Sequence, residues 1–262
     1  MNDIATKLPF RIGTSSYIYP DNIIPNVRKL KNRVDDIELV LFEVRDKSNI
    51  PSRQELNELA RIAGENSLSY TAHMPLDIDL GSVTEKKRLS SVEKVTELME
   101  HLSVLEPYAH ILHLNLSTLT KEDISLWQDR VNNSLRRILE KTKIDSTRVA
   151  IENLDYHFIH AESIIDFNRL SVCIDIGHLI NMRFDVRKHL AGYLKKTRVI
   201  HLHGVNNGKD HTSLKYLDKK LIKYIWKLLK DNDYCGVLTL EVFSEKNFEE
   251  SLSVLNQLIK DL

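Results

Sequence analysis

Histidine and carboxylate side chains recur near the ends of short apolar segments from residue 73 onwards. They comprise His73, His113, Glu152, Asp175, His178, His201, His203, His211 and Glu241. Burying an unpaired charge costs on the order of several kcal/mol, so one place that gathers these groups needs a compensating cation. Imidazole and carboxylate ligands without a thiolate suit zinc, manganese, iron or cobalt. These residue types therefore predict a site for divalent metal ions.

The number of candidate ligands bears on the chemistry. A single ion takes about four to six ligands, and this set is larger. Either some members orient the ligands, or the site holds two or three ions. Zinc is the expected ion, and manganese or magnesium remains open. Several adjacent ions favour phosphoester hydrolysis, in which they activate water and bind both the attacking and the leaving oxygen.

Eight short segments rich in Val, Ile and Leu are predicted to be the strands that carry these residues. They are nearly continuous apolar runs, which is typical of parallel strands that are buried on both faces. The segments are Phe10–Ser16, Ile37–Glu43, Ser69–Pro75, His110–Leu116, Arg148–Leu154, Ser171–His178, Arg198–Val205 and Gly236–Val242.

Amphipathic segments between these runs predict helices over 52–64, 83–105, 120–141, 214–231 and 247–262. Ser52 and Glu55 form a capping box, and Gly64 is expected to end the first of these helices. The helices after the first and sixth strands have no clear pattern. Eight strand–helix units in about 250 residues indicate one α/β domain over 1–262, a closed (β/α)₈ TIM barrel with its site at the carboxyl ends of the strands.

Composition narrows the class of protein further. The chain has 262 residues, and its 37 Lys and Arg balance 37 Asp and Glu, so a nucleic-acid partner is not expected. No apolar run is long enough for a membrane span or, in Met1–Phe10, for a signal peptide. Cys173 and Cys235 both lie in apolar runs and are expected to be reduced core thiols, which favours a cytoplasmic location. The oligomeric state does not follow from the sequence.

The whole chain resembles the xylose isomerase-like barrels, which include the endonuclease IV group and many sugar isomerases and epimerases. The one-metal epimerases of that superfamily take a Glu, an Asp, a His and a Glu from strands five to eight. The matching residues here, in order, are Glu152, Asp175, His201 and Glu241. The resemblance therefore implies at least one ion bound by these four side chains.

The endonuclease IV group binds three zinc ions, and this resemblance implies a larger ligand set. His73, His113 and Glu152 match the ligands of one ion, and His178 and His211 match two ligands of the third. That group has an Asp two residues before the last His. Lys209 stands there in this chain, with Asp210 one residue later, so whether Asp210 is a ligand stays open.

Five segments resemble the cobamide-remodelling phosphodiesterases, which belong to the same superfamily. They are Gly13–Val27, Asp35–Glu43, Tyr70–Gly81, His201–Val205 and Asp210–Leu214. Those enzymes hydrolyse the phosphodiester in the nucleotide loop of a cobamide, a compound of the vitamin B12 class. The resemblance implies a metal-dependent hydrolase with a small-molecule substrate. Neutral charge and short βα loops weigh against the alternative of an AP endonuclease.

Individual roles follow as hypotheses. Glu152 and Glu241 are expected on nearly opposite sides of the barrel as catalytic carboxylates, with His203 as a donor to the leaving oxygen. Tyr17, Asn115 and Asn153 are the candidate substrate-binding residues. In a one-metal isomerase or epimerase, the two glutamates would instead be the acid and base flanking a sugar carbon. A third alternative is a barrel that binds a ligand without turnover.

Overall fold

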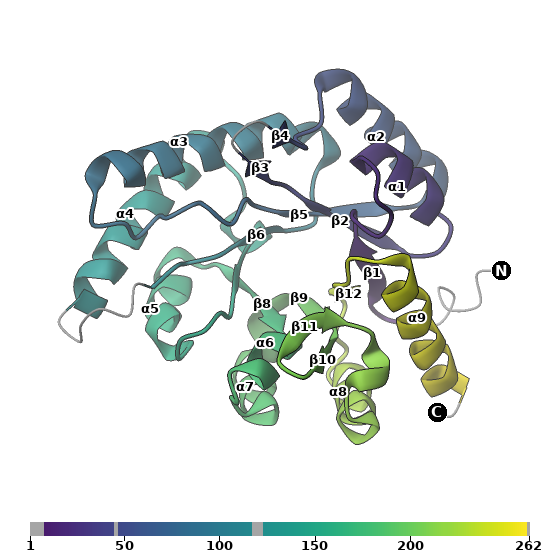
Figure 1. Ribbon diagram of the computed structural model, residues 1–262. Coiled ribbons are helices and arrows are strands. Elements are labelled where there is room, and N and C mark those ends of the chain that lie inside the picture. Colours follow the sequence, from purple (N-terminus) through teal and green to yellow (C-terminus); the bar gives the residue numbers. More distant parts are fainter. Residues whose placement is uncertain (1–7, 45–46, 117–122, 261–262) are drawn as a thin grey trace.

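Eight parallel strands form a closed barrel in the computed structural model, which describes residues 8–44, 47–116 and 123–260 (Figure 1). The strands follow one another around the barrel in the order β1-β12-β9-β8-β7-β6-β5-β2. Their bounds are β1 Arg11–Ser15, β2 Asp36–Val40, β5 Ser69–His73, β6 His110–Leu112, β7 Val149–Glu152, β8 Ser171–Asp175, β9 Thr197–Leu202 and β12 Val237–Leu240. Each lies in one of the eight predicted segments or overlaps it, so the (β/α)₈ barrel is confirmed.

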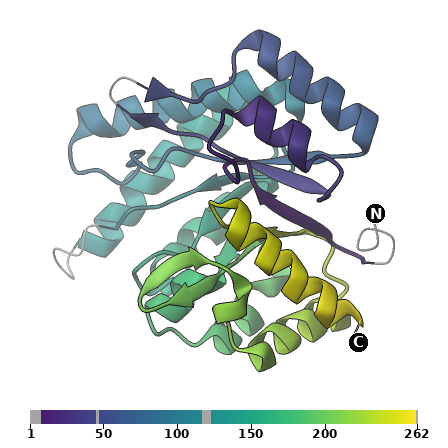
Figure 2. The same cartoon turned by 45° about the vertical axis from the view of Figure 1, so that its right-hand side comes forward.

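Helices surround the strands on the outside of the barrel (Figures 1 and 2). Figure 2 shows the last helix (yellow) next to the first strand (purple), and Arg33, in the connection before β2, forms an ion pair with Glu249 of that helix. The helices are α1 Ile23–Leu30, α2 Arg53–Asn66, α3 Glu85–Leu102, α4 Asp123–Thr142, α5 Ile159–Asn168, α6 Ile176–Asn181, α7 Val186–Tyr193, α8 Lys219–Asp231 and α9 Glu245–Lys260. Within the described ranges, none of them is long and apolar enough to cross a bilayer.

Helix ends differ from the predicted ones in several places. Ser52 and Glu55 form the expected capping box, but α2 continues through Gly64 and ends at a left-handed Ser67 with φ 53°. The segment predicted as one helix over 214–231 is a 3₁₀ turn followed by α8, which Asp218 caps. Helix α1 follows the first strand, and α6 and α7 follow the sixth, where the sequence has no clear pattern. The predicted helix start at residue 120 lies outside the described residues.

An antiparallel strand pair lies in the connection after β2 and a β-hairpin in the connection after β9, so the expectation of short βα loops is wrong at these two places. The first consists of β3 Glu43–Val44 and β4 Lys47–Ser48. The second consists of β10 Gly204–Asn206 and β11 Lys209–Thr212. Asn207 and Gly208 have φ values of 51° and 76°, which is the Asn-Gly pattern of a tight two-residue hairpin turn. This hairpin returns the chain toward the barrel mouth.

The main apolar core lies between the barrel and its helices, and the interior of the barrel is polar toward the carboxyl ends of its strands. Lower in the interior, a small cluster that includes Ala150, Cys173 and Val199 fills the space. These three residues lie two positions before Glu152, Asp175 and His201, so strand alternation points the latter into the same interior. Cys173 is buried as predicted, but Cys235 is exposed, and its expected core position is wrong.

Candidate metal centre

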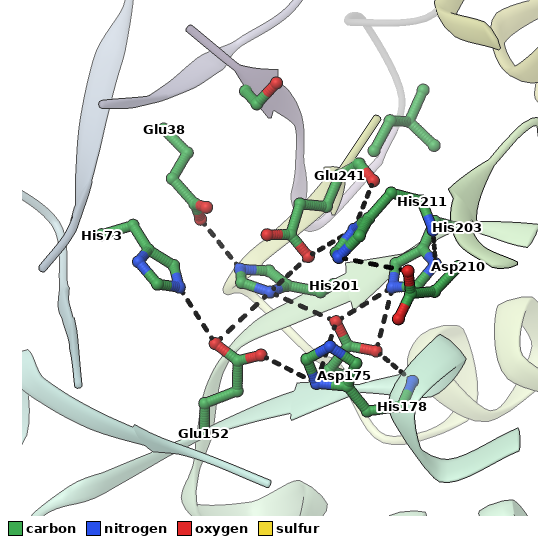
Figure 3. A network of polar contacts seen from close by, with 12 residues as sticks. Glu38, His73, Glu152, Asp175, His178, His201, His203, Asp210, His211 and Glu241 are labelled. Carbon is green, nitrogen blue, oxygen red and sulfur yellow. Dashed lines mark hydrogen bonds and ion pairs between the residues drawn. The ribbon is translucent and has the colours of Figure 1, made fainter. Parts of the chain in front are cut away.

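Glu152 is the carboxylate around which the site is arranged. It ends β7 and is only 1% exposed. Its Oε2 lies 3.1 Å from His113 Nε2 and 3.3 Å from His73 Nε2, and its Oε1 lies 3.2 Å from His178 Nδ1. Figure 3 shows His73 and His178 approaching this carboxylate from different sides. Neighbouring strands β5, β6 and β7 thus supply a three-residue group with two imidazoles and one carboxylate.

His201, on β9, is the centre of a second group that shares Glu152. Its Nδ1 lies 3.0 Å from Glu241 Oε2, 3.6 Å from Asp175 Oδ2 and 3.7 Å from Glu152 Oε2 (Figure 3). Although buried, His201 Nδ1 and Glu241 Oε2 have no hydrogen-bond partner. Unpartnered buried ligand atoms that face one another fit a cation between them. The donor set matches the ligands that zinc and similar ions prefer.

The barrel order agrees with the expected positions of the two glutamates. Glu152 on β7 and Glu241 after β12 belong to the fifth and eighth barrel strands, three steps apart in a ring of eight, so they approach the centre from nearly opposite sides. Both carboxylates approach the same nitrogen of His201. They can therefore bind one ion together.

A third group lies at the edge of the site. The nitrogens of His178, His203 and His211 lie within 4.8 Å of one another. His211, from the β10–β11 hairpin, places Nδ1 3.5 Å from Glu241 Oε2 and Nε2 4.0 Å from Asp210 Oδ1. Asp210 also accepts a 3.4 Å hydrogen bond from Asn181. The hairpin thus brings Asp210 to the site although it stands one residue later than the family's Asp.

Glu38 is a site residue that the sequence analysis missed. It is fully buried on β2, and its Oε2 lies 2.9 Å from His201 Nε2. Ile37 and Leu39 on either side of it face the apolar core, so strand alternation points Glu38 into the barrel. A charged residue between apolar neighbours in a strand was the available signal. Glu38 lies in the middle of its strand, whereas the predicted ligands lie near strand ends.

The side chains of Asn153 and Asn115 form hydrogen bonds with nearby backbone groups. Asn153 Oδ1 accepts from the backbone N–H of Asp175 at 2.8 Å, and its Nδ2 donates to the carbonyl of Asp175 at 3.0 Å. Asn115 Nδ2 donates to the carbonyl of Ile78 at 3.0 Å. Asn153 therefore fixes the end of β8, and Asn115 joins two loops.

Tyr17 and His203 lie in opposite environments. Tyr17 is 37% exposed after β1, and its ring centroid lies 5.6 Å from that of Phe42. His203 is fully buried and points its Nε2 at both carboxylate oxygens of Asp175, each 3.1 Å away. His203 therefore lies behind Asp175 and not at the mouth, where a donor to a leaving oxygen would have to be.

The buried carboxylates and the neighbouring histidines shift one another's pKa values. Burial alone would raise the pKa of Glu152, but the charges of His113 and His201 outweigh it and hold the pKa well below its usual range. Burial lowers the pKa of His73, yet the hydrogen bond and charge of Glu152 raise it to about 9. Asp175 and Glu152 likewise overcome burial and raise the pKa of His178 to about 10. The buried carboxylates thus demand positive charge, which protons supply when no metal is bound.

The family of this chain follows from comparison with known proteins. Residues 32–258 match the family model of the xylose isomerase-like TIM barrel, and the chain belongs to this family. A probable endonuclease 4 of Aster yellows witches'-broom phytoplasma (strain AYWB) is 24% identical over 60% of this chain, and the match spans 59% of that relative's length.

Two solved structures show the shared fold. A D-tagatose 3-epimerase-like protein superposes with a TM-score of 0.77 at 18% identity, over 96% of this chain and 97% of the other. The IolI protein with a binding zinc atom gives 0.75 at 14% identity, over 96% and 99%.

Proposed function

We propose that this protein is a metal-dependent phosphodiesterase that hydrolyses the nucleotide-loop phosphodiester of cobamides. One observation carries the hydrolytic part of the proposal. Glu152 belongs to two ligand groups at once, one with His73 and His113 and one with His201, Asp175 and Glu241. A carboxylate shared in this way suits two neighbouring ions. A single-metal isomerase has no need of the group formed with His73 and His113.

Side chains already present define where each ion would be held. His73, His113 and Glu152 would hold one, and Glu152, Asp175, His201 and Glu241 the other. His178, His211 and Asp210 could hold a third at the edge. Bound ions supply positive charge that lowers the pKa of water toward neutrality and offsets the charge of a phosphodiester.

Two glutamates and two histidines have separate roles in this proposal. Glu152 and Glu241 orient the ligand cluster from β7 and from the residue after β12, and both carboxylates are buried. The side chains of His178 and His211 are 21% and 25% exposed, so they border the open side of the cluster. An N–H of either imidazole can donate to a phosphate oxygen there.

Aromatic side chains on three consecutive loops support a substrate with a large apolar body. Phe243 follows β12, Tyr17 follows β1 and Phe42 follows β2, and these strands are neighbours in the barrel. Phe243 is 41% exposed, and its ring centroid lies 5.0 Å from that of His211. This rim combines an apolar surface with a charged centre. A cobamide matches that combination, since it joins an anionic phosphodiester to a bulky macrocycle.

A one-metal sugar epimerase or isomerase is the second candidate. The specific observation in its favour is that Glu152, Asp175, His201 and Glu241 form a complete ligand set without any other residue. In that case Glu152 and Glu241 would exchange a proton with a carbon between them. The similarity to a D-tagatose 3-epimerase-like structure is compatible with this candidate.

One experiment separates the candidates. The protein is loaded with zinc or with manganese and incubated with cobalamin in one set of reactions and with ketohexoses in another. We expect cobinamide phosphate and the lower-ligand nucleoside from cobalamin, and no epimerised sugar. Epimerisation without phosphodiester cleavage would move the assignment to the second candidate. Tight binding of a ligand without turnover in either set would leave a non-catalytic barrel.

A further inference from the structure

His203 makes contacts that tie two metal-ligand candidates together. Its Nε2 lies 3.1 Å from each carboxylate oxygen of Asp175. Its Nδ1 lies 2.9 Å from the backbone nitrogen of His211, which donates to it. His203 therefore joins the end of β8 to the β10–β11 hairpin, and Figure 3 shows it beside Asp175 and His211.

The contact with His211 decides the tautomer of His203. Two N–H donors cannot face each other at 2.9 Å, so Nδ1 carries no proton. The carbonyl of Gly204 is a competing partner for Nδ1, but it lies farther away at 3.3 Å. The proton is consequently on Nε2, where it is donated to Asp175. With both ring nitrogens engaged by the protein, His203 has none left for a metal ion.

The position of the ring depends on the absence of a side chain at residue 177. A Cβ on Gly177 would lie 1.9 Å from Cε1 of His203 and 2.4 Å from its Nδ1. Gly177 is the second residue of α6, a place where a helix would otherwise favour alanine. The backbone here does not require glycine, because its φ is outside the left-handed region. The space taken by His203 is therefore the reason for this glycine.

His211 itself gains from the contact. It has a φ of 49°, which is costly for a residue with a Cβ, and the hydrogen bond from its N–H to His203 helps to hold it there. The same imidazole thus orients the carboxylate of Asp175 and the backbone of His211.

From this geometry we infer that His203 is a positioning residue, neither a metal ligand nor a proton donor to the substrate, and that Gly177 provides its space. The inference rests on the proposed metal centre but not on the identity of the substrate. In this inference the imidazole of His203 aligns Asp175 with His211, and Gly177 leaves room for that ring. Loss of the imidazole and addition of a methyl group at residue 177 should then have the same consequence.

The first test uses the zinc-loaded protein, in which the metal offsets the charge of the buried carboxylates. Nitrogen-15 NMR at pH 8 should show His203 with the proton on Nε2 and an unprotonated Nδ1. A proton on Nδ1 would overturn the inference. This result holds or fails whether or not the protein cleaves a phosphodiester, so it is independent of the proposed function.

The second test is a double-mutant cycle read by zinc affinity in chelator competition. We expect His203→Ala and Gly177→Ala each to weaken zinc binding by about 10- to 100-fold. In the double variant the methyl group meets no ring, so its effect should be no larger than that of His203→Ala alone. His203→Gln should recover most of the affinity, because an amide can both donate to Asp175 and accept from His211. Fully additive losses, or a Gln variant as weak as the Ala variant, would overturn the inference.

Gly64→Ala and Gly192→Ala are matched controls. Both glycines have nothing within 4 Å of an added Cβ, and both lie in helices. Neither substitution should change zinc affinity. If the controls lose affinity as Gly177→Ala does, the effect of Gly177→Ala is not specific to His203, and the inference is wrong.

Discussion

Glu38 and His201 meet inside the barrel, with 2.9 Å between Glu38 Oε2 and His201 Nε2. The pair joins β2 to β9, which are separated by β1 and β12 in the barrel order. Because Nε2 donates to Glu38, the other nitrogen of His201 is left to face Glu241, Asp175 and Glu152. A carboxylate that fixes a histidine in this way is common behind metal ligands.

Replacing Glu38 tests this pair. Glu38→Leu should weaken zinc binding by about 10- to 100-fold, because His201 loses the partner that fixes its ring. Glu38→Gln keeps an acceptor oxygen and should have a smaller effect. Chelator competition measures both, with the exposed Glu65→Gln as a control. Unchanged affinity in Glu38→Leu would show that His201 needs no such support.

His113 separates a two-metal hydrolase from a one-metal enzyme. His113 belongs only to the ligand group that it forms with His73 and Glu152, so His113→Ala removes a ligand from one ion only. We expect it to reduce phosphodiester cleavage by at least about 100-fold and to remove about one bound ion per chain. Steady-state kinetics and elemental analysis of the same sample measure both, with His160→Ala on α5 as a control. Cleavage that persists with fewer ions would refute the shared-carboxylate hydrolase.

The aromatic rim predicts a selective effect on large substrates. Tyr17→Ala or Phe243→Ala should raise the KM for a cobamide by about tenfold, the loss expected from roughly 1.4 kcal/mol of aromatic contact. Methyl 4-nitrophenyl phosphate lacks the macrocycle and should lose much less than the cobamide does. Phe167→Ala, which removes a 75% exposed ring on α5, serves as the control. Equal losses on both substrates would mean that these rings support the fold and not the substrate.

Asp36 predicts a pH dependence of stability away from the ligand cluster. Burial raises its pKa from 3.8 to about 6, against the opposing hydrogen bond from Ser69. The folded state thus binds this proton more tightly than the unfolded chain, so stability falls as pH rises from 3.8 toward 6 and stays lowered above it. Asp36→Asn removes the ionisation.

The stability gain of Asp36→Asn should therefore be greater at pH 8 than at pH 5, by roughly 1–2 kcal/mol. Urea unfolding of the metal-free protein at the two pH values measures it. The exposed Asp129→Asn is the matched control and should show no such difference. A gain that is the same at both pH values would contradict a buried, reluctantly ionised Asp36.

The barrel could be predicted because parallel strands that are buried on both faces give long apolar runs. The segment 171–178 illustrates both the strength and the limit of that signal, since β8 ends at Asp175 and His178 already belongs to α6. Helix ends were harder to predict: α2 runs past Gly64 and ends at Ser67, where the backbone N–H groups of Ser67 and Leu68 both donate to the carbonyl of Ala63. The exposure of Cys235 was missed because an apolar neighbourhood in sequence does not fix burial.

The ligand candidates could be predicted, but their roles could not. Strand ends meet at one mouth in any such barrel, so His73, Glu152 and His201 were bound to converge. The role of His203 depends on a backbone N–H of a hairpin that the sequence analysis treated as a simple loop. Glu38 lies in the middle of its strand. There, only the alternation of side chains along the strand decides whether a residue faces the helices or the inside of the barrel. The contact of His203 with a distant hairpin has no signature in a single sequence, whereas Glu38 stands out only as a charged residue between apolar neighbours.

The number of metal ions bound per chain distinguishes a multinuclear centre from a one-metal site. The protein is loaded with excess zinc, freed of loosely bound metal by gel filtration, and analysed by inductively coupled plasma mass spectrometry. We expect two or three zinc ions per chain, and one fewer in His113→Ala. One ion in both proteins would contradict the shared Glu152 site and favour the one-metal isomerase, and no ion in either would contradict a metal centre altogether.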